Sequence, residues 1–164
     1  MNPKLMFAAI IAAIFGLMAW SVEPAYAGGT ATDPCSLFTR GQVSAVLGVN
    51  VDPPKQVAPT MCEWSAVNQP SSINSKKVAL LISNARAFGF AKTPVVNDEK
   101  AEPVSGVCDD AIYSFPTGTK SGSATSLFVK KGSSYFTVHV YGFPDQAKAM
   151  AIEKMLALDA CSKF

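Results

Sequence analysis

The only histidine of the chain, His139, stands in the segment Tyr135–Tyr141, where apolar and polar side chains alternate. In a strand, successive side chains point to opposite faces, so one face carries Phe136, Val138 and Val140. The other face carries Tyr135, Thr137, His139 and Tyr141. Aromatic rings with a few polar tips suit a ligand or a protein partner, so we predict a binding face here. Phe128 and Lys130 of the preceding run join it if the register allows, and a half-exposed face with a hydrogen-bonded histidine is the alternative.

Catalytic chemistry has little support in the sequence. A nucleophile needs a positioned base and a group that orients the base, and His139 is the only imidazole. No Gly-x-Ser-x-Gly segment is present. Asp109 and Asp110 precede the strand predicted at residues 111–115, and we expect a solvated turn there. If the strand included them, their carboxylates would point to opposite faces and form a poor pair. We therefore predict no catalytic residue, no metal site and no cofactor.

Two alternating runs within Thr125–Gly142, joined at Lys131-Gly132-Ser133, position His139. They predict a hairpin at the centre of an antiparallel sheet. Three further strands are predicted at residues 62–67, 76–83 and 111–115. The second of these has apolar residues at both odd and even positions, so both of its faces are apolar, which favours an interior place in the sheet. Residues 93–106 are polar and contain two prolines, so we expect a long connection there.

Two helices are predicted outside this series of strands. Thr39 and Gln42 form the capping-box pattern at the start of a helix over Arg40–Leu47, and Gly48 is placed to end it. The last helix is expected over Gln146–Ala160. Its predicted apolar stripe is Ala147, Ala151, Met155 and Leu158, with Ile152 and Leu156 beside it.

Strands grouped between helices predict a single α+β domain over residues 28–164. We expect a twisted antiparallel sheet of about five strands. The N-terminal short helix and the C-terminal helix should pack on one face of it, and two disulfides should brace it. Asn84 could cap a further short helix that carries Phe88, but Gly89 weakens that prediction.

The four cysteines are Cys35, Cys62, Cys108 and Cys161. An even number in an exported chain predicts two disulfides, and four cysteines allow three pairings. The placement of the elements favours Cys35–Cys62 and Cys108–Cys161, because each bond would tie a helix to the sheet on which it packs.

Residues 1–27 have the three parts of a secretory signal peptide. Lys4 precedes an apolar run from Leu5 to Trp20, and Ala25-Tyr26-Ala27 precedes the expected cleavage site. The run is shorter than the about 20 residues that span a bilayer, although a retained anchor is the alternative. We expect an exported protein, periplasmic or secreted, with no membrane span after cleavage.

The net charge of +2, from 14 basic and 12 acidic residues, argues against nucleic-acid binding. We expect a monomer.

Several short motifs recur in one known family: Asp33-Pro34-Cys35, a short helix ending at Gly48, Cys62-Glu63-Trp64, the lead Val104–Tyr113 and the hairpin Val129–Phe136. In these the chain resembles a domain of unknown function found in small secreted lipoproteins and related exported proteins, chiefly of actinobacteria. The resemblance covers most of the chain from Asp33 to Cys161. It implies an α+β fold related to extracytoplasmic sensor domains of bacterial kinases, and it implies no chemistry. The chain departs from the family in lacking a lipidated cysteine and in having Cys108 and Cys161, which favours a bond between those two.

The sequence leaves three hypotheses of function. The first is an exported, non-enzymatic binding or sensor-like domain of the cell envelope, whose partner is an unknown small molecule or envelope protein. The second is an envelope structural or inhibitor-type protein that acts through surface loops such as Thr93–Gly106. The third and weakest is a hydrolase that uses His139 as its base.

Overall fold

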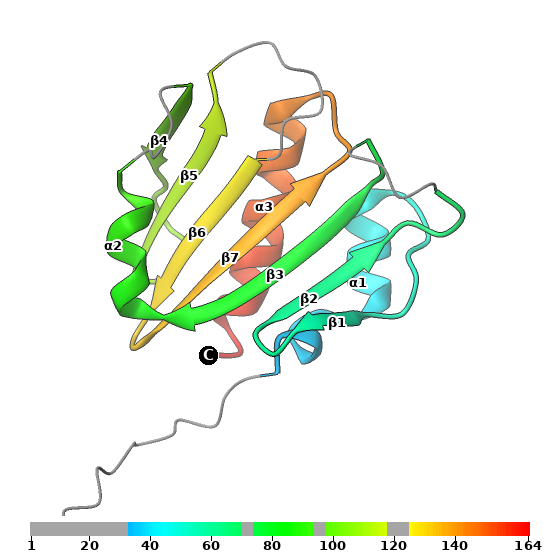
Figure 1. The fold of residues 1–164 in the computed structure, drawn as a ribbon, viewed down its shortest axis with the longest axis horizontal. Coiled ribbons are helices and arrows are strands. Elements are labelled where there is room, and N and C mark those ends of the chain that lie inside the picture. Colours follow the sequence, from blue (N-terminus) through cyan, green and yellow to red (C-terminus); the bar gives the residue numbers. More distant parts are fainter. Residues whose placement is uncertain (1–32, 70–73, 94–97, 118–124) are drawn as a thin grey trace, which may run out of the picture. The chain divides into compact units, whose positions relative to one another are not determined.

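The computed structural model describes residues 33–69, 74–93, 98–117 and 125–164. Over these residues the chain has an α+β fold in which seven strands form one antiparallel sheet, in the order β1-β2-β3-β7-β6-β5-β4 (Figure 1). The strands are β1 Lys55–Ala58, β2 Met61–Ser65, β3 Lys77–Asn84, β4 Glu99–Pro103, β5 Asp110–Pro116, β6 Thr125–Lys131 and β7 Ser134–Tyr141. The helices are η1 Pro34–Ser36, α1 Arg40–Leu47, η2 Ala85–Ala87, α2 Phe88–Ala91 and α3 Gln146–Cys161. The predicted signal peptide and its cleavage site lie outside the described residues.

The predicted hairpin is β6 and β7, and β7 is the middle strand of the sheet. Gly132, with φ of 56°, supplies the left-handed residue of the turn between them. β3 pairs with β7 from Lys77 opposite Tyr141 to Asn84 opposite Ser134. The central hairpin is therefore as the alternation of side chains predicts, and β3 is interior as its apolar residues at both odd and even positions predict.

The sheet has seven strands where about five were predicted. The two additional strands, β1 and β4, are its edges. All four residues of β1 are exposed, and β4 is charged and contains Pro103. Neither segment alternates between apolar and polar residues, so pairing with β2 and β5 rather than local pattern makes them strands. β4 also corrects the prediction that residues 93–106 form only a long connection.

The main core lies between one face of the sheet and the two longer helices, α1 and α3 (Figure 1). The predicted core face of β7, Phe136, Val138 and Val140, is at most 1% exposed. Val43 and Leu47 of α1 and Ile152 and Leu156 of α3 belong to the same buried apolar cluster as these three side chains. Both helices on this face, and the complete capping box of Thr39 and Gln42 in α1, confirm the prediction.

The apolar stripe predicted for α3 was wrong. Met155 is 52% exposed and Leu158 is 45% exposed, and Ala147 and Ala151 are exposed as well. The buried side chains are Ala149, Ile152, Glu153, Leu156, Ala157 and Ala160. Alanine occurs all around this helix, so hydrophobicity alone selects no face, and packing against β6 and β7 decides which side is buried.

The opposite face of the sheet carries the short η2–α2 segment. The Asn84 side chain accepts a hydrogen bond from the Arg86 amide at 3.0 Å, so the cap considered at Asn84 is present. Phe88 of α2 is buried against Ile112 and Tyr135 in a second, smaller apolar cluster. The structure thus adds a partial cover on a face that the sequence left open.

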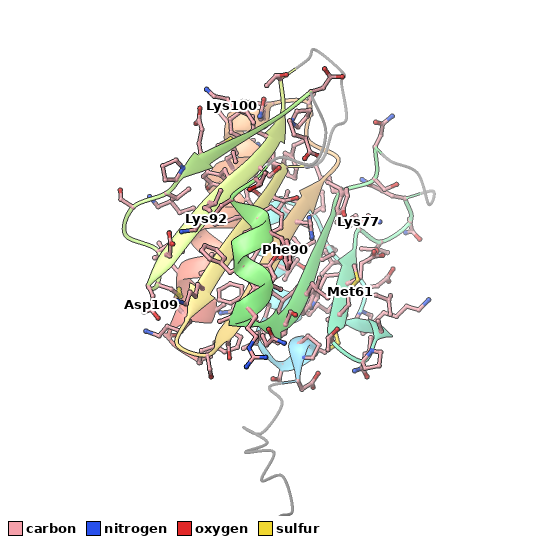
Figure 2. The ribbon with its side chains drawn as sticks, turned by 60° about the vertical axis from the view of Figure 1, so that its left-hand side comes forward. Met61, Lys77, Phe90, Lys92, Lys100 and Asp109 are labelled. Atoms are coloured by element: carbon pink, nitrogen blue, oxygen red, sulfur yellow. A yellow bond between two sulfur atoms is a disulfide. The ribbon has the colours of Figure 1, made fainter. Side chains whose placement is uncertain are left out.

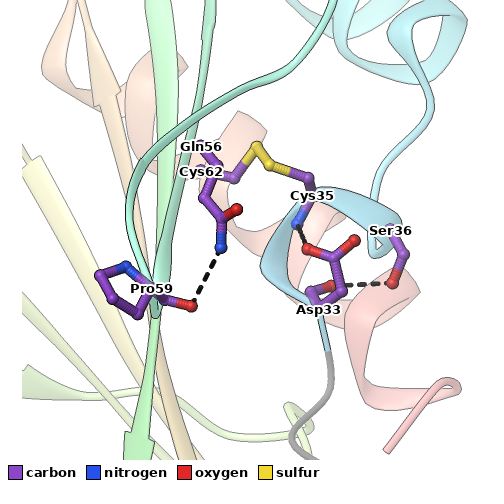
Figure 3. Close-up of a disulfide and its surroundings, with 6 residues drawn as sticks. All are labelled: Asp33, Cys35, Ser36, Gln56, Pro59 and Cys62. Atoms are coloured by element: carbon purple, nitrogen blue, oxygen red, sulfur yellow. Dashed lines mark hydrogen bonds between the residues drawn. A yellow bond between two sulfur atoms is a disulfide. The ribbon is translucent and has the colours of Figure 1, made fainter.

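Two disulfides brace the sheet. Cys35 is bonded to Cys62, which ties η1 to β2 (Figure 3), and Cys108 is bonded to Cys161, which ties the segment before β5 to the end of α3. The Asp33 carboxylate accepts from the Cys35 amide at 2.9 Å and holds the first cysteine in its short helical turn (Figure 3). The predicted pairing is confirmed. Within the described residues, no helix is both long and apolar enough to cross a membrane.

Candidate ligand-binding face

A continuous series of ring contacts crosses the sheet on the face away from α1 and α3. We call its members, Phe88, Tyr135, Phe128, His139 and Tyr141, the aromatic row. Ring centroids are 5.9 Å apart for Phe88–Tyr135, 6.2 Å for Phe128–Tyr135, 6.4 Å for Phe128–His139 and 6.2 Å for His139–Tyr141. Strand alternation on β6 and β7 places four of these rings on one face, and α2 supplies the fifth.

The register of β6 and β7 decides how the six predicted site residues lie together. Phe128 is opposite Thr137 and Lys130 is opposite Tyr135. Phe128 therefore enters the aromatic row between Tyr135 and His139. Lys130 lies beside Tyr135 at the end of the row and is half-buried.

Two of the six predicted residues are closed to solvent. Tyr135 is 7% exposed and Thr137 is 1% exposed. The Thr137 hydroxyl donates to the Tyr135 phenol oxygen at 3.0 Å. Burial raises the pKa of Tyr135, so the phenol is neutral across the physiological range. These two side chains are therefore the buried part of the face, and Phe88 packs against Tyr135.

His139 is half-buried in the middle of the row. Its Nδ1 atom lies 2.7 Å from the Ser126 hydroxyl on the neighbouring strand. Burial lowers the pKa of His139 to about 4, so the imidazole is neutral near pH 7. Among the described residues no carboxylate is hydrogen-bonded to this imidazole, so none of them orients His139 as a carboxylate orients a catalytic histidine.

Charged groups lie at the Tyr141 end of the aromatic row. The Lys77 ammonium lies 4.7 Å from the centre of the Tyr141 ring and 3.2 Å from the Glu63 carboxylate. The Ser65 hydroxyl donates to the same carboxylate at 2.9 Å. Each charge at this end already has a partner, so this end is less able to attract a charged ligand.

A hollow of about 230 Å³ lies between α2 and the other end of the row. We call it the α2 hollow. The aromatic residues of its lining are Phe90, Phe128 and Tyr135, and the other polar residues of the lining are Thr93, Glu99 and Ser114. Phe90 is 80% exposed although it is large and apolar, and Figure 2 shows it on α2 in front of the sheet. An exposed ring beside a hollow lined with other rings is the arrangement that an apolar ligand would cover.

Sequence reasoning found Tyr135 and Phe128 but missed the other wall of the α2 hollow. Phe90 belongs to the short helix α2, which has no side-chain cap of its own and follows η2, the turn that Asn84 caps. Glu99 belongs to β4, which has no alternating pattern. Ser126 could have been found, because it stands two residues before Phe128 and shares its face by strand alternation.

Among the described residues, no three His, Cys, Asp or Glu side chains are placed to hold a metal ion. No protein-family model, curated protein or solved structure matches this chain. The family resemblance carried by the Asp33-Pro34-Cys35 and Cys62-Glu63-Trp64 motifs stays a prediction. The function must therefore be argued from the site alone.

Proposed function

We propose that this chain is an exported, non-enzymatic binding domain of the cell envelope that holds the apolar part of a small molecule or partner in the α2 hollow. The α2 hollow is the observation that carries the proposal. Its 230 Å³ is somewhat below the about 300–1,000 Å³ of drug-sized sites. It would accommodate a single ring or one apolar side chain, with the rest of the ligand extending along the aromatic row.

Export is supported by two independent features. Residues 1–27 have the pattern of a signal peptide. The two disulfides fit a compartment outside the reducing cytoplasm. Ligands met by such a domain would be those of the envelope or the surroundings.

A binding role suits the chemistry of His139 better than a hydrolytic one. A base that is neutral near pH 7 but has a pKa of about 4 takes up a proton weakly. Its Nδ1 atom is already engaged with Ser126. The imidazole then acts as part of an aromatic surface with one polar edge.

The first experiment is native mass spectrometry of the protein purified from its own envelope, compared with a Phe90→Ala variant. Phe90 is 80% exposed, so its removal should leave the fold intact while it opens the hollow. Leu158→Ala is the matched control, because Leu158 is an exposed apolar side chain of α3, whose buried side packs on the opposite face of the sheet. We expect a bound species that Phe90→Ala loses and Leu158→Ala keeps.

Two further variants ask how far the ligand extends. His139→Ala and Tyr141→Ala shorten the aromatic row away from the hollow, and loss of binding in either would extend the site to them. A bound species that survives Phe90→Ala, His139→Ala and Tyr141→Ala would remove this face from consideration.

A further inference from the structure

We infer that the α2 hollow selects an organic cation, an ammonium group that carries apolar or aromatic substituents. The inference rests on the proposed function and names the chemical class of its ligand. Two features of the hollow carry it: aromatic rings from three elements, and a lining carboxylate that has no ion-pair partner among the described residues.

The rings come from α2, β6 and β7 as Phe90, Phe128 and Tyr135. Phe128 and Tyr135 are stacked at an interplanar angle of 10°. Aromatic faces carry negative charge density and attract a cation, most strongly where water is excluded. A partly enclosed wall of several rings is the arrangement by which proteins recognise alkylated ammonium groups.

The carboxylate is Glu99 on the edge strand β4. Within the described part of the chain, Glu99 takes part in no ion pair. Its neighbour on the same strand, Glu102, is paired with Lys100 at 2.5 Å and does not line the hollow. Among the described residues that line the hollow, Glu99 has the only carboxylate, and no described cation is paired with it.

The basic side chains described near the hollow do not line it. Lys92 is paired with Asp110 at 2.9 Å and lies over the Phe88 ring. Neither Lys92 nor Lys130 contributes to the lining of the hollow. Among the described residues, an anionic ligand would therefore meet Glu99 without a compensating cation in the lining, whereas a cationic ligand would meet both the rings and the carboxylate.

The test compares three probes that share a benzyl group and differ in charge: benzyltrimethylammonium, its neutral isostere neopentylbenzene, and phenylacetate. Each is titrated into the full chain with both disulfides intact, and Kd is measured by NMR from the shifts of the Phe90 and Phe128 resonances. We expect the cation to bind about tenfold more tightly than the neutral isostere. Glu99→Gln should weaken the cation about fivefold and leave the neutral probe unchanged. Glu102→Gln is the matched control and should leave every Kd unchanged.

The possible failures separate this inference from the proposed function. If the neutral isostere or phenylacetate binds as tightly as the cation and Phe90→Ala weakens it, the hollow binds ligands but does not select cations. If Glu99→Gln and Glu102→Gln weaken the cation equally, the effect is one of general surface charge and the inference is wrong. If no probe shifts these resonances and Phe90→Ala loses no native ligand, both the inference and the proposed function fail.

Discussion

The carboxyl of Glu153 accepts a hydrogen bond from the hydroxyl of Thr125 at 2.9 Å, which joins α3 to the first residue of β6. The same oxygen, Oε1, accepts from the Val140 amide of β7 at 3.1 Å. Glu153 is fully buried, and its other oxygen has no hydrogen-bond partner among the described residues. Burial raises the pKa of Glu153 to about 8. The two hydrogen bonds lower this pKa, but their effect is smaller than that of burial. The folded protein therefore keeps a neutral carboxyl in its core at pH 7.

Glu153 should make the protein less stable as pH rises. Between its ordinary pKa of 4.5 and about 8, the folded state holds a proton that the unfolded chain releases, so the free energy of unfolding falls through this window and is level above it. We expect a loss of about 2 kcal/mol between pH 6.5 and pH 8. Glu153→Gln keeps an oxygen acceptor but has no proton to lose, so its stability should be level over this range. Urea unfolding at a series of pH values measures this, and equal slopes in the two proteins would contradict it.

His139 should act in the opposite direction at lower pH. Its pKa is lowered from 6.5 to about 4, so the unfolded chain takes up a proton in this window and the folded state does not. Stability contributed by neutral His139 is complete above pH 6.5 and is lost as pH falls through 4. Over pH 4.5 to 6.5 this loss opposes the gain from Glu153, and the wild-type protein should be nearly level.

The variant His139→Gln separates the opposing effects of His139 and Glu153 on the free energy of unfolding. The glutamine side chain can still bond to Ser126, so the main change is the loss of the titrating group. The variant should become more stable as pH is lowered from 6.5 to 4.5, because Glu153 then acts unopposed. An NMR titration of the imidazole that gives a pKa near 6.5 in the folded protein would refute the argument.

Each disulfide should contribute substantially to stability. The bonds close loops with sequence separations of 27 and 53 residues, for which the chain-entropy model gives about 3–4 kcal/mol each. We expect the double variants Cys35→Ala/Cys62→Ala and Cys108→Ala/Cys161→Ala to lower the free energy of unfolding by amounts of this order. Urea unfolding measures the loss. Peptide mapping without reductant checks the pairing, and a peptide joining Cys35 to Cys108 would contradict it.

Gly142 should be essential to the turn between β7 and α3. It has φ of 79°, and a Cβ atom there would lie 2.6 Å from the backbone of Ser75 and Lys76. Gly142→Ala therefore combines a left-handed conformation with a backbone clash and should cost at least about 3 kcal/mol. Gly132→Ala is the control: its φ is 56° but a Cβ would meet nothing within 4 Å, so it should cost only about 1–2 kcal/mol. Equal losses in thermal or urea unfolding would show that the contact at Gly142 is not limiting.

Some elements were determined by residues close together in the chain. The capping box of Thr39 and Gln42 and the C-cap at Gly48 fix α1 through hydrogen bonds within one or two turns. Alternation fixes the β6–β7 hairpin and its buried face, because a shift of one residue would turn Phe136, Val138 and Val140 to the other side. The disulfide pairing followed from where each cysteine stood relative to the predicted helices and strands.

Other features depend on contacts between distant segments. β1 and β4 have no local strand pattern and exist through pairing with their neighbours. The buried side of α3, which includes Glu153, is selected by packing on β6 and β7. The sequence therefore predicted the wrong stripe on a helix whose existence and bounds it predicted well.

The candidate site divides in the same way. By itself the sequence determined that Tyr135, Thr137, His139 and Tyr141 share one face, because the period of a strand is a local property. Only the tertiary structure brought Phe90 and Glu99 to that face, because η2–α2 and β4 reach it through contacts with β5, β6 and β7. A pocket needs walls from several elements, and their distances are fixed by packing and register rather than by neighbouring residues.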